Sequence, residues 1–278
     1  MDRKKSKFRS NRLSPLSPAA RCGGVAFAAA ILLAAVDPRL ATVPLTLFVA
    51  LCAVAPFLPR AGFFFPVVYR GNTGRPMVAL TFDDGPDPAT TPRLLDLLDR
   101  HGVQATFFVT GRRAARHPHL VREIVRRGHT LGNHTFHHGR LAMYWRSALM
   151  RREIADTQAV LKQAGVVPLA FRPPVGITTP PMAGVLAAGG LFTVNFSCRA
   201  ADWGNRRIRR LSAAILKRVK PDDIILLHDT DAGSVNRNDR WLHEIERILK
   251  GLPARGLSVA PLERLIGRPV SINLSATP

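Results

Sequence analysis

Two neighbouring carboxylates, Asp83 and Asp84, follow the apolar segment 77–82 and are closed off by Gly85-Pro86. The apolar run reads as a short buried strand, and the Gly-Pro pair ends it. Two carboxylates at the end of a strand repel each other, so a positive group is expected beside them. A metal ion or an arginine would meet this need, and water alone is the third alternative.

A histidine-rich segment, GNHTFHH at 132–138, supplies the second group of side chains that could do chemistry. Two histidines and one carboxylate form a common ligand set for a catalytic metal that keeps one position open for water. The spacing leaves the histidine pair ambiguous, because His134 could act either with His137 or with His138. The two segments together predict a metal site near Asp84.

Strand-like and helix-like segments alternate from Met77 onward, and they must position these side chains. The predicted strands are 77–83, 105–110, 129–134, 168–172, 191–196, 223–228 and 256–260. The predicted helices are 91–101, 118–127, 145–164, 181–188, 208–219 and 240–250. This alternation indicates an α/β fold with parallel βαβ units, arranged as an open sheet or a barrel.

Polar groups stand at the carboxyl end of most of the predicted strands, which is where the chemistry of such barrels gathers. These groups are Asp83-Asp84, His134 to His138, Arg172-Pro173-Pro174, Asp202-Trp203 and His228-Asp229. One buried histidine or one exposed acid would need no explanation. Their repeated placement at the same end of the strands predicts a single site.

The same positions carry motifs that occur together, and in this order, in one known family. They are TFDDGP at 81–86, HTFHH at 134–138, RPPVG at 172–176, DW at 202–203 and LLHD at 226–229. Residues 76 to about 230 therefore resemble the polysaccharide deacetylase family, also called carbohydrate esterase family 4 or the NodB homology domain. The resemblance implies a distorted (β/α) barrel with fewer than eight strands. It also implies hydrolytic removal of an acyl group from an N-acylated, less often O-acylated, sugar.

The resemblance also implies which side chains bind the metal. The family pattern is His-(Ser/Thr)-x-x-His, which makes His134 and His138 the histidine ligands and leaves His137 outside the set. Asp84 is the third ligand, and Thr135 is a local support. The expected cofactor is a divalent metal, with Zn²⁺ as the first choice, which would polarise the amide carbonyl and lower the pKa of bound water.

Further roles follow from the same resemblance. Asp83 is expected to be the base, with Arg172 paired to it, and His228 the acid that protonates the leaving amine. The backbone N–H of Val175 would stabilise the oxyanion, and Leu226 would line a pocket for the acetyl methyl group. Pro174 and Trp203 are assigned to the substrate side of the site, as members of the third and fourth motifs.

Two positions depart from the family pattern. Val175 stands where the family usually has Tyr, so an aromatic wall is lost while the backbone donor remains. Arg199 replaces the first Asp of the usual Asp-x-x-Asp-Trp motif. A cation there would lower the pKa of His228, unless Asp202 takes over the support of that imidazole.

The N-terminal part is a different kind of sequence. A basic head at 1–21 precedes two apolar runs, 22–36 and 40–58, which predict a membrane segment at 22–58 with one or two helices. Residues 59–75 are expected to be a juxtamembrane linker, and 76–278 the catalytic domain. These features predict a bacterial inner-membrane location with membrane lipid as a partner. The distribution of Lys and Arg slightly favours a hairpin with the domain on the cytoplasmic side over a single span at 40–58 with the domain outside.

The overall composition excludes some functions. The formal net charge is +21, from 40 Lys and Arg against 19 Asp and Glu, but the excess is spread along the chain. Nucleic acid is therefore not expected as a partner, since binding it calls for a basic stripe with interleaved aromatic residues. Only 3 cysteines occur, so neither a disulfide framework nor a thiolate metal site is expected.

The predicted function is thus a membrane-anchored, metal-dependent deacetylase that acts on an N-acylated glycan. The glycan could be peptidoglycan, a secreted exopolysaccharide, a chitin-like oligomer or a lipid-linked sugar. One alternative is a pseudoenzyme of the same fold that binds a glycan without cleaving it. Another is a basic scaffold protein at the membrane, which would make no use of the residues at the strand ends.

Overall fold

The apolar run that precedes the two carboxylates forms the central strand, β2 (Met77–Asp83). Every residue of β2 is buried, as expected for a strand covered on both faces. The computed structural model describes residues 16–139 and 146–274. In it, β2 pairs in parallel with β3 (Thr106–Val109) and β9 (Ile224–His228). Asp83 lies in register with His228, so the strand ends bring these two residues to the same edge of the sheet.

Short strands on either side complete an α/β half-barrel of parallel strands in the order β1-β7-β6-β4-β3-β2-β9-β8, and β10 pairs with the start of β2. These strands are β1 (Val67–Val68), β4 (Thr130–Asn133), β6 (Ala170–Phe171), β7 (Phe192–Val194), β8 (Cys198–Arg199) and β10 (Ser258–Val259). A separate antiparallel pair consists of β5 (Val166–Pro168) and β11 (Ser271–Asn273). The expectation of fewer than eight strands is wrong. The reason is that β1, from the segment expected to be a linker, and β8 have two residues each, which is too short for any sequence periodicity.

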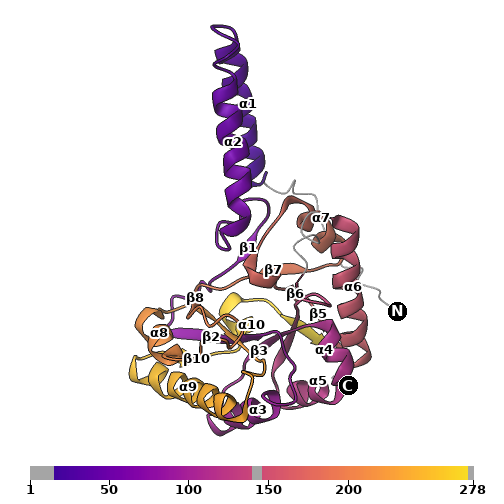
Figure 1. Cartoon of the computed structure of the whole chain (residues 1–278), viewed down its shortest axis with the longest axis vertical. Coiled ribbons are helices and arrows are strands. Elements are labelled where there is room, and N and C mark those ends of the chain that lie inside the picture. Colours follow the sequence, from indigo (N-terminus) through magenta and orange to yellow (C-terminus); the bar gives the residue numbers. More distant parts are fainter. Residues whose placement is uncertain (1–15, 140–145, 275–278) are drawn as a thin grey trace, which may run out of the picture.

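Helices cover the sheet, and each predicted helical segment overlaps an observed one (Figure 1). They are α3 (Thr91–Arg100), α4 (Gly111–Arg116), α5 (Pro118–Arg126), α6 (Ser147–Gln163), α7 (Pro180–Ala188), α8 (Leu211–Arg218), α9 (Val235–Ala254) and α10 (Leu262–Ile266). The short helices α4 and α10 were not predicted. Single 3₁₀ turns occur at Ala55–Phe57 and Pro174–Gly176.

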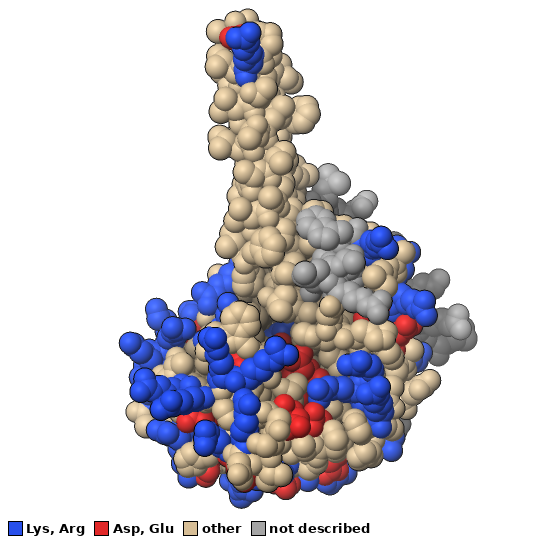
Figure 2. Space-filling view, in the orientation of Figure 1, with Lys and Arg blue, Asp and Glu red and all other residues tan. Residues whose placement is uncertain are grey.

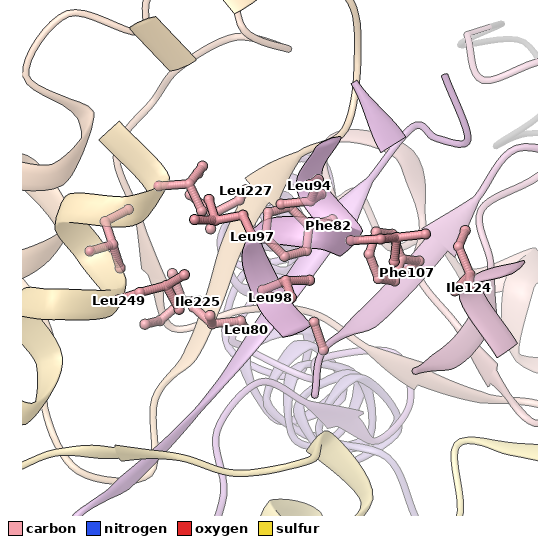
Figure 3. Packing of buried hydrophobic residues seen from close by; sticks show 14 of the residues in the cluster. Leu80, Phe82, Leu94, Leu97, Leu98, Phe107, Ile124, Ile225, Leu227 and Leu249 are labelled. Carbon is pink, nitrogen blue, oxygen red and sulfur yellow. The ribbon is translucent and has the colours of Figure 1, made fainter. Parts of the chain in front are cut away.

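A hydrophobic core holds the carboxyl end of β2 in place (Figure 3). Leu80 and Phe82 point from β2 toward Leu94 and Leu98 of α3, and all four side chains are buried. The Phe82 ring stacks on Phe107 of β3, with 5.4 Å between the ring centroids. Burying one such side chain stabilises the fold by about 1.5–3 kcal/mol. The backbone that presents Asp83 is therefore rigidly supported.

The two apolar runs near the N-terminus form a helical hairpin, α1 (Pro18–Ala34) and α2 (Thr42–Val54), which projects from the domain (Figure 1). The helices pack closely at Gly23, where an added Cβ would lie only 3.0 Å from the Phe48 ring. The base of the helical hairpin is attached to the domain, because the Thr178 N–H donates to Pro56 O and the Arg60 guanidinium donates to Ser197 O.

The predicted membrane segment at 22–58 is corrected by this geometry. Within residues 16–139 and 146–274, no helix combines the length and the apolar character needed to cross a membrane. The 17 residues of α1 rise about 26 Å and the 13 residues of α2 about 20 Å, against a hydrocarbon core of about 30 Å. The second apolar run has 19 residues in the sequence, but its α-helix is shorter. Its first residues belong to the turn between the two helices, and its last residues belong to the 3₁₀ turn.

The predictions that depended on a membrane span therefore fail with it. The prediction of an inner-membrane location with a cytoplasmic catalytic domain is corrected, because the spanning helix on which it depended is not found in the described residues. The prediction of membrane lipid as a partner depended on the same helix. Most of the basic head, residues 1–15, lies outside the part of the chain that the structure describes.

Candidate functional site

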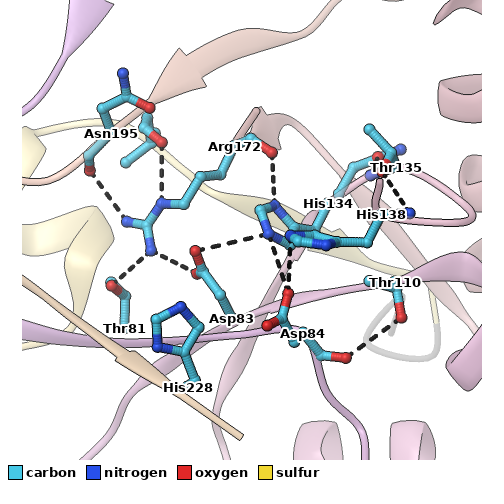
Figure 4. Close-up of polar contacts among 12 residues, drawn as sticks. Thr81, Asp83, Asp84, Thr110, His134, Thr135, His138, Arg172, Asn195 and His228 are labelled. Atoms are coloured by element: carbon cyan, nitrogen blue, oxygen red, sulfur yellow. Dashed lines mark hydrogen bonds and ion pairs between the residues drawn. The ribbon is translucent and has the colours of Figure 1, made fainter. Parts of the chain in front are cut away.

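Strand ends bring the predicted site residues together at one edge of the half-barrel (Figure 4). His134 directly follows β4, and Arg172 follows β6, which pairs with β4 at Asn133. His228 is the last residue of β9, beside Asp83. These side chains come from four strands and point toward one another, as the sequence led us to expect.

Asp84, His134 and His138 form a compact group of possible metal ligands, with their ligand atoms within 4.8 Å of one another. Asp84 Oδ1 lies 3.1 Å from His138 Nε2 and 3.5 Å from His134 Nε2. This oxygen is buried and has no hydrogen-bond partner in the described chain. A buried carboxylate oxygen facing two imidazole nitrogens, and not itself hydrogen-bonded, fits a divalent cation between them.

The protonation of the histidines suits the same role. His134 Nδ1 lies 2.7 Å from the Arg172 carbonyl oxygen, which can only accept, so Nδ1 carries the proton and Nε2 is left as a ligand atom. Burial and the neighbouring His134 lower the pKa of His138, which keeps that imidazole neutral. Burial alone would raise the pKa of Asp84, but the neighbouring imidazoles of His134, His138 and His228 outweigh it, and they leave the pKa well below its usual value.

His137, the alternative ligand, points elsewhere. Its Nδ1 lies 2.7 Å from Glu153 Oε1 on α6, and its side chain is 51% exposed. The other oxygen of Glu153 accepts hydrogen bonds from the backbone N–H groups of Phe136 and His137. Glu153 therefore holds the loop between His134 and His138 from behind and keeps His137 out of the ligand group.

Asp83 and Arg172 form a buried ion pair. Arg172 is fully buried, and its Nη1 donates to Asp83 Oδ1 at 2.7 Å and to Thr81 Oγ1 at 2.8 Å. The guanidinium also donates to the carbonyl oxygens of Val194 and Asn195. Arg172 is thus fixed by several hydrogen bonds, and it fixes one oxygen of Asp83. The other oxygen, Oδ2, faces His134 Nε2 at 3.7 Å.

His228 has Asp202 as its partner, with Nδ1 and Oδ2 2.8 Å apart. Burial alone would lower the pKa of His228, but the hydrogen bond and charge of Asp202, with Asp84 and Asp83, raise it to about 9. The cation at Arg199 was expected to lower this pKa unless Asp202 supported the imidazole. Asp202 supplies that support, and the Arg199 guanidinium instead lies over the Phe196 ring, 5.5 Å from its centroid.

Three of the four predicted substrate residues line a cleft of about 860 Å³, and Pro174 is not among its lining residues. Val175, Trp203 and Leu226 line it together with Asp83 and His228. Val175 has a φ of 52°, which is strained for a β-branched residue and typical of functional turns. Its side chain and that of Trp203 are exposed at the cleft, while Leu226 and Pro174 are buried.

Residues that hold the site from behind were given no role by the sequence reasoning. Asn133 Oδ1 accepts from the Thr135 N–H, and its side-chain amide donates to α6. Asp229 accepts from Thr90 and Thr91 at the start of α3, and burial raises its pKa to about 7. Asn133 and Asp229 could have been found, because they adjoin His134 and His228 in the sequence. Glu153 gave no signal, since it lies on a separate helix among other charged residues.

Comparisons with known proteins agree with this geometry. The sequence model of the family described as "Polysaccharide deacetylase" matches residues 70–193. The chain is 34% identical over 209 residues to a chitooligosaccharide deacetylase of Bradyrhizobium sp. (strain ANU 289), covering 71% of this chain and 94% of that protein. It is 33% identical over 202 residues to a peptidoglycan-N-acetylglucosamine deacetylase of Bacillus cereus, covering 72% and 92%.

A solved structure gives the same result for the fold. The Bc1960 peptidoglycan N-acetylglucosamine deacetylase superposes with a TM-score of 0.67 at 29% identity, over 73% of this chain and 94% of that one. These three relatives are matched over nearly their whole length. The chain belongs to the polysaccharide deacetylase family of hydrolases.

Proposed function

We propose that the chain hydrolyses the N-acetyl group of an amino sugar in an oligosaccharide or polysaccharide. The observation that carries this proposal is that Asp84 Oδ1 lies between two imidazole nitrogens without a hydrogen bond of its own. Beside it are the Asp83 carboxylate, which Arg172 holds, and the His228 imidazole, which Asp202 holds. A deacetylase needs these three parts: a metal site, a base and an acid. The relatives named above are deacetylases of chitooligosaccharide or of peptidoglycan N-acetylglucosamine, and these are the first substrates to test.

Asp84, His134 and His138 would hold the metal, with Zn²⁺ suited to two nitrogen ligands and one carboxylate. A cation bound there would polarise the acetamide carbonyl and lower the pKa of water in the site. Asp83 Oδ2 is the oxygen that Arg172 leaves free, so it is placed to accept the proton of the attacking water. Arg172 keeps this carboxylate in one orientation throughout the reaction.

His228 would complete the reaction when the C–N bond breaks. Asp202 occupies Nδ1, so Nε2 is the atom that gives a proton to the departing amine. The backbone N–H of Val175 is our candidate donor to the oxyanion, and Leu226 would contact the acetyl methyl group. Trp203, exposed at the cleft, offers an aromatic face to the neighbouring sugar.

A binding-only pseudoenzyme is less well supported, because the candidate base, acid and metal ligands are all present in the cleft. To test the function, the full chain is loaded with Zn²⁺ and incubated with chitotetraose and with peptidoglycan, and released acetate is measured. We expect acetate release that is abolished by a chelator and by Asp84→Ala. A chain that binds one metal ion but releases acetate from neither glycan would favour the pseudoenzyme.

The pH dependence tests the role of Asp202. His228 must be protonated to act as an acid, so activity should fall as pH rises through its pKa, which is raised to about 9. A cation on Asp84 would offset part of this rise. Asp202→Asn keeps an acceptor for Nδ1 but removes the charge, so the alkaline limb of kcat should move to lower pH by about one unit or more. An alkaline limb unchanged in the variant would contradict the pairing of Asp202 with the catalytic acid.

A further inference from the structure

Arginines without an acidic partner surround the cleft. Arg199 on β8, Arg206 in the following segment and Arg237 in the first turn of α9 all line it, and their side chains are exposed. In the part of the chain that the structure describes, none of these three forms a salt bridge. An excess of Lys and Arg is plain on the face that Figure 2 shows. The rim of the cleft therefore carries more positive charge than its own acids neutralise, with Asp231 near Arg237.

Two of these guanidinium groups have a defined position. Arg237 Nη2 donates to the carbonyl oxygens of Arg206 at 3.0 Å and Asn205 at 3.4 Å. Arg199 lies over the Phe196 ring. Contacts with carbonyl oxygens and an aromatic ring orient a guanidinium and leave its net charge available to a ligand.

Three of the four acids that line the cleft are already engaged. Asp83 pairs with Arg172, Asp84 belongs to the ligand group, and Asp202 pairs with His228. The fourth, Asp231, accepts from the Gly233 N–H and from the Asn238 side chain, keeps its charge, and offsets part of the charge of Arg237. The fourth arginine of the cleft, Arg113, is paired with Asp87, which leaves Arg199, Arg206 and Arg237 for a ligand.

We propose that the cleft takes an N-acylated glycan with an anionic group, a carboxylate or a phosphate, close to the acylated sugar. This inference rests on the proposed deacetylase function and narrows its substrate class. A neutral glycan would meet the metal site and Trp203 equally well but would give the three guanidinium groups no anionic partner. An anionic oxygen group would form charge-assisted, bidentate hydrogen bonds with them.

The test compares three glycans with one backbone. They are chitotetraose, chitotetraose partly oxidised to carboxylate at C6, and chitotetraose partly phosphorylated at C6, the last two as mixtures of positions. The full chain loaded with Zn²⁺ is assayed for acetate release at low and at high salt. We expect kcat/KM to be about tenfold higher for one anionic glycan than for the neutral one at low salt. Each exposed ion pair contributes a few-fold, and more than one of the three guanidinium groups can take part. High salt should reduce the ratio. The better of the two anionic glycans identifies the group.

Charge variants connect the preference to the cleft. Arg199→Gln combined with Arg206→Gln should bring the ratio of anionic to neutral kcat/KM close to one, while the two Lys replacements should restore much of it. The control is Arg209→Gln, compared with each single cleft variant so that one charge is removed in both, because Arg209 is exposed in the same segment and does not line the cleft. This control is needed because the whole chain has a formal charge of +21. It should leave the ratio unchanged.

The outcomes separate the two proposals. If no glycan releases acetate, the deacetylase function fails and the inference fails with it. If acetate is released with equal kcat/KM from all three glycans, the inference alone is overturned. It is also overturned if Arg209→Gln lowers the ratio as much as the cleft variants do, because the preference would then come from the net charge of the chain.

Discussion

Asp83→Asn is expected to lower the rate of acetate release by about 10²–10⁴-fold while the protein still binds its metal. The amide oxygen can still accept the hydrogen bond from Arg172, so the side chain keeps its place, but it cannot take a proton from the attacking water. The neighbouring Asp84→Asn should behave differently, because it removes a ligand atom. Measuring both activity and bound metal for these two variants separates a base from a ligand.

Folding must be followed in the same experiment. Arg172 is fully buried, and removing the charge of its partner costs up to about 3–5 kcal/mol of stability. Thermal unfolding of the metal-loaded Asp83→Asn protein shows whether the assay temperature is low enough for the comparison. A folded, metal-bound variant with activity within a few-fold of the unsubstituted chain would rule out Asp83 as the base.

The central part of the fold was predictable because its sequence signals are local. The strand 77–83 was predicted with the bounds that β2 has, since an apolar run ends there in two carboxylates. The gathering of the polar strand ends in one site follows from one rule, that parallel strands carry their chemistry at their carboxyl ends. The ligand set and the separate roles came from the resemblance to the family. The strands β1 and β8 were not predicted, because a two-residue strand has no sequence pattern of its own and is defined only by its pairing with a neighbouring strand. The role of Glu153 was not predicted, because it depends on how α6 packs behind the loop that carries the histidines.

The membrane prediction failed for a different physical reason. A count of apolar residues measures composition, whereas a span depends on the length of continuous helix. The run at 40–58 is apolar throughout, but its first residues continue the turn that begins at Asp37-Pro38, and its last residues form the 3₁₀ turn Ala55–Phe57. The carbonyl oxygen of Pro59, just beyond, accepts a hydrogen bond from Asn195, which itself holds Arg172. The end of this apolar run is thus attached to the catalytic half-barrel.

Zn²⁺ affinity distinguishes His137 from His138 as the metal ligand, and we expect a large difference between the two variants. His138→Ala should weaken Zn²⁺ binding by more than the roughly 10–100-fold that outer-shell changes cost, because it removes a ligand nitrogen 3.1 Å from Asp84 Oδ1. His137→Ala should weaken binding by less than about tenfold. It removes one contact of Glu153, which keeps its hydrogen bond to the Phe136 N–H and so continues to hold the loop.

The two variants form a matched pair, since they remove the same side chain from adjacent positions of one loop. The full-length proteins are stripped with a chelator and titrated with Zn²⁺ against a competing indicator, with His134→Ala as the reference for a lost ligand. Loss of metal in His137→Ala, with His138→Ala retaining it, would reverse the assignment. That result would require His137 to leave Glu153 and turn into the group around Asp84. Because His138 Nε2 already lies 3.1 Å from Asp84 Oδ1, whereas His137 would first have to give up its contact with Glu153, we expect the metal to stay with His138.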